Sequence, residues 1–174
     1  LSGNLLDQVR IAYCIPRIIS IITVSDGTLI NMFPTDLHGA VGEKNYVSSL
    51  RKGGLANTQV EKYNKIVISD VDTSFCKQAY ALGKNHMHEM TDINAFSTYV
   101  ERSAKLKLPL PKSVLRYKEL SRIDSFDHNI HRIHLYEVIH AQTIESGKST
   151  LAHIHQYYAQ WRLDQSFPTQ MILR

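Results

Sequence analysis

The chain has 174 residues, of which 43% are hydrophobic and 21% charged, and this balance fits one globular domain with a real core rather than a disordered chain. No stretch approaches the ~20 apolar residues that a membrane helix needs, so we expect no membrane contact. The net charge of +4 is spread without a basic run, which favours a phosphate-bearing small molecule and no nucleic acid as the partner.

The two cysteines, Cys14 and Cys76, lie far apart and show no CxxC spacing. This pattern argues against a zinc ribbon and against a disulfide framework. We expect both to be buried thiols of a soluble, cytoplasmic protein. No secretory signal is readable, because Pro16 and Arg17 interrupt the apolar stretch near the N-terminus.

The first 50 residues predict three strands. Residues 18–24 are β-branched, and Asp26-Gly27 supplies the positive φ angles of a tight hairpin, after which residues 29–33 return antiparallel. Pro34 is expected to end this pairing and to open a loop. Residues 46–50 then predict the next strand.

Two helices are predicted in the middle of the chain. After Gly53-Gly54 the apolar residues recur at helical spacing over 55–63, and residues 66–69 return to strand character. Asp72, Thr73 or Ser74 can cap a second helix, which runs to Leu82 and is expected to end at Gly83. We interpret residues 84–88 as a loop.

The last part of the chain predicts more strands. Residues 91–111 contain Leu-Pro-Leu-Pro and are interpreted as a helix-bearing excursion followed by an extended connector. Three strand-like runs follow at 114–122, 130–144 and 151–161. About six strands with small helices predict a mainly β fold, as one domain over 1–174.

The common nucleotide and metal motifs are absent from the sequence. There is no GxGxxG and no GxxxxGK[ST]. His128, His131 and His134 are spaced by three, which within one strand would put them on alternate faces. We therefore predict no metal site.

The best candidate for a phosphate site is the segment 48–54, which combines hydroxyls, cations and glycines: Ser48, Ser49, Leu50, Arg51, Lys52, Gly53 and Gly54. The glycines let backbone N–H groups approach an anion at the start of a helix, where the helix dipole also favours negative charge. The same composition suits a solvated turn, and the residues alone leave both interpretations open.

Two other segments are candidates for contacts to a cofactor. Residues 31–39 form a polar stretch that can present backbone donors to a planar heterocycle, with side-chain hydrogen bonds from Asn31, Thr35 and Asp36. Phe126-Asp127-His128 places a histidine beside a carboxylate, which can tune a proton site or face a cofactor. By composition alone, residues 31–39 are an ordinary polar loop, and Phe126-Asp127-His128 does not indicate a function.

In this order, the three segments resemble the flavin reductase-like family, whose fold is the FMN-binding split barrel. The likeness starts near Pro16, runs through the segments above and includes residues 79–87 and the final strands. It covers most of the chain. The fold that it implies is a split β-barrel of the FMN-binding type with small helices.

The resemblance also implies roles for individual residues. Contacts to the flavin ring and ribityl chain are implied for Asn31, Phe33, Pro34, Thr35, Asp36 and Leu37. Phosphate contacts are implied for Ser48, Ser49, Leu50, Arg51 and Lys52. Closure over the flavin is expected from Lys84, Asn85 and His86, with a solvated loop as the alternative, and a nicotinamide-side contact from His128.

The implied function is a homodimeric FMN reductase, in which NADH or NADPH gives a hydride to FMN. The chain departs from the family where Phe126 stands in place of the glycine of a Gly-Asp-His motif, and where Asp36 lies in the flavin loop. These departures keep a second hypothesis open, an FMN-binding protein without reductase activity, such as a flavin carrier, a sensor or an oxygenase component. A third is an interaction domain that has lost the cofactor, which the intact Arg51 and Lys52 argue against.

Overall fold

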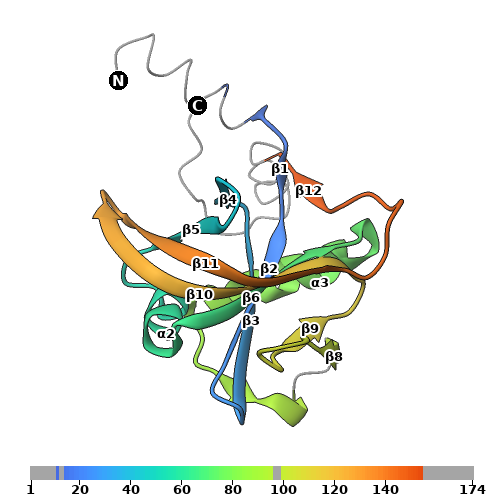
Figure 1. Cartoon of the computed structure of the whole chain (residues 1–174), viewed down its shortest axis with the longest axis horizontal. Helices are drawn as coiled ribbons and strands as arrows, with labels where there is room; N and C mark the ends of the chain where they lie inside the picture. Colours follow the sequence, from blue (N-terminus) through green and yellow to red (C-terminus); the bar gives the residue numbers. More distant parts are fainter. Residues whose placement is uncertain (1–10, 12–13, 96–98, 155–174) are drawn as a thin grey trace, which may run out of the picture. The chain divides into compact units, whose positions relative to one another are not determined.

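The computed structural model describes residues 11, 14–95 and 99–154 (Figure 1). The chain divides into two compact units, Ile19–Leu151 and a unit formed by Leu1–Ile18 with Ala152–Arg174. In the second unit, β1 (Arg17–Ile18) pairs antiparallel with β12 (Ala152–His153). Most of the strand predicted at 151–161 lies outside the described residues. The single domain over 1–174 stays a prediction.

The larger unit is built on an antiparallel sheet. Its strands are β2 (Ser20–Ser25), β3 (Leu29–Thr35), β4 (His38–Val41), β5 (Asn45–Arg51), β6 (Lys65–Val71), β7 (Thr91–Asp92), β10 (Val114–His128) and β11 (His131–Thr143). Their order in the sheet is β4-β5-β11-β10-β6-β2-β3-β7, with β4 and β7 as open edges. The predicted mainly β fold with small helices is confirmed.

The β2–β3 hairpin forms for the reason that the sequence indicates. Asp26 Oδ1 accepts hydrogen bonds from the backbone N–H groups of Thr28 and Leu29 at 3.0 and 2.7 Å. Gly27 has a φ of 106°, which a residue with a side chain rarely adopts. The turn therefore fixes the register in which Ile22 lies opposite Phe33, both fully buried.

The prediction that Pro34 ends the pairing is wrong, because Pro34 lies within β3 opposite Ile21. Its carbonyl accepts a hydrogen bond on the side away from β2. In a strand the N and C=O of one residue point to the same side, so the N–H that proline lacks is one that β2 does not need. The predicted loop after Pro34 also contains the short strand β4.

The two predicted helices are confirmed, the first with the predicted bounds. Helix α2 spans Leu55–Tyr63, and the second helix begins as η1 (Thr73–Phe75), continues as α3 (Cys76–Leu82) and has Asp72 accepting from the N–H of Ser74. Gly83 keeps a right-handed conformation. The chain therefore continues as the 3-10 helix η2 (Gly83–Met87) where a loop was predicted. None of the described helices is long and apolar enough to span a membrane.

Residues 91–111 differ from the prediction, because the Pro-rich end is paired. After β7 come η3 (Ile93–Ala95) and the hairpin β8 (Tyr99–Arg102) with β9 (Pro109–Pro111). The carboxylate of Glu119 on β10 is fully buried and accepts from the N–H groups of Lys105 and Leu106, at 2.9 and 2.6 Å. This side chain attaches the hairpin loop to the main sheet.

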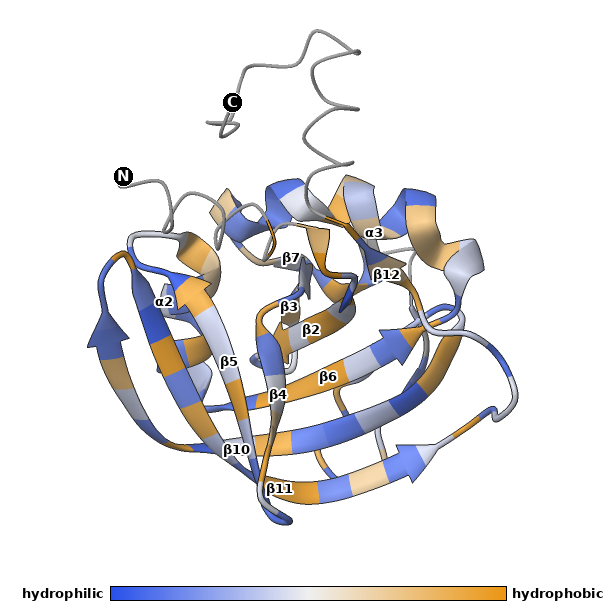
Figure 2. Cartoon of the chain, turned by 90° about the horizontal axis from the view of Figure 1, so that it is seen from above, coloured by the Kyte–Doolittle hydropathy of each residue, from blue (hydrophilic) through white to orange (hydrophobic). Residues whose placement is uncertain are grey.

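The hairpin of β10 and β11 is the longest element and joins the two sides of the sheet, because β10 pairs with β6 and β11 pairs with β5. Hydrophobic and hydrophilic bands alternate along its strands (Figure 2). Leu120 and Tyr136 contribute to the core beneath α2, together with Phe33 and Val60.

The histidine and cysteine predictions need correction. A turn at Asn129, which has a φ of 51°, separates His128 from His131, so these two lie opposite each other across the hairpin rather than on alternate faces of one strand. No group of three His, Cys, Asp or Glu within the described ranges can hold a metal ion. Neither cysteine forms a disulfide, but Cys14 is exposed and Cys76 is half-buried, so neither is a buried thiol.

His134 joins β11 to α2 through a buried hydrogen bond. Its Nε2–H donates to Asn57 Oδ1 at 2.9 Å, since a carbonyl oxygen can only accept. No described residue bonds its buried Nδ1. Burial, with a smaller contribution from Arg122, lowers the pKa of His134 to about 4.

The shifted pKa of His134 predicts a pH-dependent stability. An unfolded histidine titrates at about 6.5, so between pH ~6.5 and ~4 only the unfolded chain takes up the proton, and stability falls. Urea denaturation of the wild type should lose about 3 kcal/mol between pH 7 and 4 that H134Q does not lose. H128Q, at an exposed histidine, is the control. An identical pH profile for the wild type and H134Q would contradict this account.

Candidate functional site

Strand β3 extends beyond its short pairing with β7, and side chains of η2 cover this part of its edge. Asn85 Nδ2 donates to the carbonyl of Met32 at 2.9 Å, and His86 Nε2 donates to the carbonyl of Pro34 at 2.7 Å. The His86 ring also lies 4.9 Å from the ring of Phe33. Burial lowers the pKa of His86, so the imidazole is held neutral beside this strand. These contacts bring two predicted site segments together.

A buried amide network joins the same strand to α2. Asn31 is 2% exposed, and its Nδ2 donates to Gln59 Oε1 at 2.7 Å and to the carbonyl of Asn85 at 3.0 Å. Gln59 Nε2 in turn donates to the carbonyl of His88 at 3.0 Å. Asn31 was predicted to contact a flavin, and the structure places its side chain inside this network. Phe33 is likewise fully buried.

Strand β5 separates the predicted phosphate residues onto two faces. Ser48 and Leu50 point to the core, where the Ser48 hydroxyl lies 2.9 Å from the hydroxyl of Tyr136. Ser49 lies on the other face, with its Oγ 3.0 Å from His131 Nδ1. The Ser49 N–H donates to the carbonyl of Leu37 at 2.8 Å. The loop at Leu37 and the segment 48–54 are therefore neighbours.

The end of β5 places two cations before α2. Arg51 is exposed, and its guanidinium has no ion pair or hydrogen bond within the described part of the chain. Lys52 Nζ lies 3.4 Å from Asp127 Oδ2. Gly53 has a φ of 78°, and Gly54 is the N-cap of α2 without a side-chain cap. The first N–H groups of an α-helix have no partner within the helix, so this end combines free donors with positive charge.

Gly54 is the point at which the segment 48–54 meets η2. A Cβ added to Gly54 would lie 3.3 Å from the carbonyl oxygen of Arg51 and 3.5 Å from that of His86. The first distance is shorter than most Cβ contacts, whereas the second is an ordinary van der Waals contact. The structure thus brings together residues from the three predicted segments around 34–37, 49–54 and 84–86.

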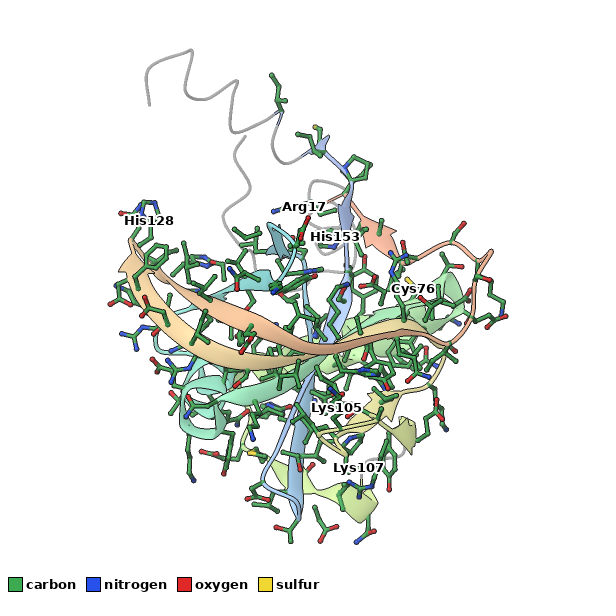
Figure 3. All side chains as sticks on the ribbon, viewed as in Figure 1. Arg17, Cys76, Lys105, Lys107, His128 and His153 are labelled. Atoms are coloured by element: carbon green, nitrogen blue, oxygen red, sulfur yellow. The ribbon has the colours of Figure 1, made fainter. Side chains whose placement is uncertain are left out.

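The Phe126-Asp127-His128 segment lies at the turn end of the β10–β11 hairpin (Figure 3). Asp127 Oδ1 accepts from Arg132 Nε at 2.7 Å, and this bond lowers the pKa of Asp127. Arg132 also pairs with Glu61 of α2. His128 is exposed and lies opposite His131, which is itself opposite Arg51.

Sequence reasoning missed Gln59, His131 and Tyr136 as residues of this region. Gln59 lies within the helix predicted at 55–63, and its amide links Asn31 to His88. The signal for His131 was available in the two-residue turn after His128, which places it beside Ser49 on the neighbouring strand. Nothing in the sequence indicates that Tyr136 would bond to Ser48.

No protein-family model matches the chain, and no curated protein matches its sequence. Solved structures do. An NADH:FAD oxidoreductase of Streptomyces globisporus matches with a TM-score of 0.72 and 14% identity over 87% of this chain and 89% of that one. The flavin reductase component of a bacterial two-component tryptophan halogenase matches with a TM-score of 0.73 and 13% identity over 86% and 94%.

An FMN-binding protein of Thermus thermophilus matches with a TM-score of 0.67 and 11% identity over 80% of this chain and 82% of that one. The chain has the fold of flavin reductases and FMN-binding proteins. At this level of identity the likeness establishes the fold, and the fold implied by the sequence resemblance is confirmed. The roles of single residues stay predictions.

Gly54 allows a test of the close approach between residue 54 and the Arg51 carbonyl at the start of α2. G54A should destabilise the protein by about 1 kcal/mol, because the added methyl would lie 3.3 Å from this backbone oxygen, closer than most such contacts, whereas its distance of 3.5 Å to the His86 carbonyl is an ordinary contact. G39A is the matched control, since no atom lies within 4 Å of a Cβ at Gly39. Urea denaturation of both variants measures the difference. Equal stabilities would mean that the close approach at Gly54 is not a constraint.

Proposed function

We propose that the chain is a flavoprotein that binds FMN, with the phosphate held by Arg51, Lys52 and Ser49 at the N-terminus of α2. The observation that carries the proposal is the Arg51 guanidinium, which is exposed beside this helix end and has no partner among the described residues. A phosphate dianion would satisfy the guanidinium, the ammonium and the first helix N–H groups together.

The residues present fit the rest of the cofactor as well. Leu37 lies next to Ser49 through the Ser49–Leu37 hydrogen bond, and we propose that Leu37 and the residues before it, Pro34, Thr35 and Asp36, contact the ring and ribityl chain. Four other predicted residues are buried and would pack beneath the contacting residues: Asn31, Phe33, Ser48 and Leu50. Asn85 and His86 hold the backbone of 32–34, while Lys84 remains a proposed contact on the outer side.

We further propose that the protein is an NADH- or NADPH-dependent flavin reductase. When bound, FMN would supply a ring that accepts a hydride and passes electrons onward. This chain's own residues would bind the phosphate, hold the loop 34–37 and present His128 on the nicotinamide side. His128 is suited to that role because it is exposed, whereas Asp127 beside it is occupied by Arg132 and Lys52.

A homodimer is part of the proposal. The outer side of the β10–β11 hairpin exposes Ile123, Phe126 and Ile130, each more than half accessible. Apolar side chains in such numbers on one hairpin suit a covered surface. Tyr157, Tyr158 and Trp161, which were also proposed for this role, lie outside the described residues. A cytoplasmic location stays a prediction, supported by two cysteines that form no disulfide.

The phosphate assignment is tested with R51A/K52A. Hydrogen bonds to charged groups contribute roughly 1.5–3 kcal/mol each, so the affinity for FMN should fall at least ~100-fold. Riboflavin, which lacks the phosphate, is the matched ligand, and its affinity should not change. Titration calorimetry measures both. An unchanged FMN affinity, or an equal loss for riboflavin, would contradict the phosphate assignment.

The reductase proposal is tested by the colour of the FMN-loaded protein. Anaerobic NADH or NADPH should bleach the flavin absorbance near ~450 nm, and H128A should slow the bleaching while keeping the FMN affinity. A yellow protein that neither nucleotide bleaches would instead support the FMN-binding protein without reductase activity, such as a carrier, a sensor or an oxygenase component. A protein that takes up no FMN would refute both functions.

A further inference from the structure

A second candidate site lies at the other end of α2. A cavity of about 340 Å³ is formed by the β2–β3 turn, the last residue of α2, the start of β6 and the β8–β9 hairpin. Tyr63, Leu106 and Leu108 give it an apolar wall. This volume falls at the lower end of the range for sites that bind small organic ligands, ~300–1,000 Å³.

The cavity is positively charged. Lys65, Arg102 and Lys107 line it together with one carboxylate, Asp26, which leaves a net charge of +2 from three cations and one anion. Hydrogen bonds from the N–H groups of Leu29 and Thr28 lower the pKa of Asp26 and occupy its Oδ1. The cavity therefore favours an anion, despite this carboxylate.

The two lysines of the cavity, Lys65 and Lys107, do not stabilise the fold through their ammonium groups within the described part of the chain. Neither Lys65 nor Lys107 makes an ion pair or side-chain hydrogen bond within the described ranges. Lys65 is also not needed to cap α2, because Arg122 serves there: its Nη2 donates to the carbonyl of Glu61 at 3.2 Å, and its N–H donates to the carbonyl of Asn64 at 2.7 Å. Both ammonium groups remain available for a ligand.

The hairpin that carries Lys107 is held in place before any ligand arrives. Ser103 and Leu108 exchange hydrogen bonds at 2.8 and 3.1 Å, and Arg102 Nη1 donates to the carbonyl of Lys107 at 2.8 Å. The buried carboxylate of Glu119 fixes the loop from below. A site that is already ordered costs less conformational entropy on binding.

We propose that this cavity binds a small organic anion, with an apolar body against Tyr63 and Leu106 and a phosphate or carboxylate group between Lys65, Arg102 and Lys107. The site shares no residue with the segment 48–54. Lys107 and His128 lie well apart in Figure 3, at different ends of the larger unit. It is thus a separate site, and it does not depend on FMN binding.

The test uses phenyl phosphate as the probe and the backbone amide signals of Gly27 and Lys107 as local reporters by NMR. The wild type should show saturable shifts at these amides at millimolar probe. K65Q/K107N should weaken binding at least tenfold; asparagine is chosen because it tolerates the left-handed backbone at residue 107, where φ is 56°. K44Q/K77Q, at two exposed lysines outside the cavity, should bind like the wild type.

Three outcomes would overturn the proposal. The first is no saturable shift at Gly27 and Lys107 in the wild type. The second is inorganic phosphate binding as tightly as phenyl phosphate, which would remove the role of the apolar wall. The third is loss of these shifts in R51A/K52A, which would assign them to the phosphate segment. Since R51A/K52A should leave the probe bound, failure here and failure of the FMN proposal are distinguishable.

Discussion

The carbonyl groups of Met32 and Pro34 lie on the side of β3 that no long strand covers. β7 pairs only with Leu29 and Ile30, so the next part of this edge needs other donors. Buried backbone groups without a partner cost as much as a lost hydrogen bond, and Asn85 and His86 supply the missing donors from η2. This requirement fixes η2 against the sheet.

Helix η2 also lies against the start of the candidate phosphate site. A Cβ at residue 54 would be in ordinary contact with the His86 carbonyl, 3.5 Å away, so Gly54 packs directly against η2. Arg51 is the last residue of β5 and Lys52 follows it, so both cations lie just before the start of α2. The donors that β3 requires therefore bring η2 next to the helix end that carries these two cations.

Much of the fold was predictable from local signals. The β-branched run before Asp26-Gly27 gave a correct hairpin, and the helical spacing over 55–63 matches α2. The incorrect predictions at Pro34 and at residues 91–111 share one cause: contacts with residues distant in sequence determine the structure there. Pro34 stays in β3 because the side that lacks an N–H faces η2, and the chain at 105–106 is held by a carboxylate at residue 119.

The sequence predicted which segments form the candidate site better than it predicted which of their side chains face outward. The segments 34–37, 49–54 and 84–86 do meet, but strand alternation turns Ser48 and Leu50 inward while Ser49 faces outward. A shift of one residue exchanges the two faces, and composition alone does not set that register. The side-chain role of Asn31 was equally unpredictable from the sequence, because its buried amide donates hydrogen bonds to Gln59 of α2 and to the Asn85 carbonyl of η2.

Helix α2 connects the two proposed sites. Its nine residues span about 14 Å, with Gly54 at the end that favours anions and Tyr63 at the end that disfavours them. An anion site at the second end therefore needs charge from elsewhere. Arg122 satisfies carbonyls at that end, and Lys65 and Lys107 come from β6 and the β8–β9 hairpin, outside the helix. Phosphate binding at the first end uses the helix itself, whereas the cavity at the second end depends on side chains from other elements.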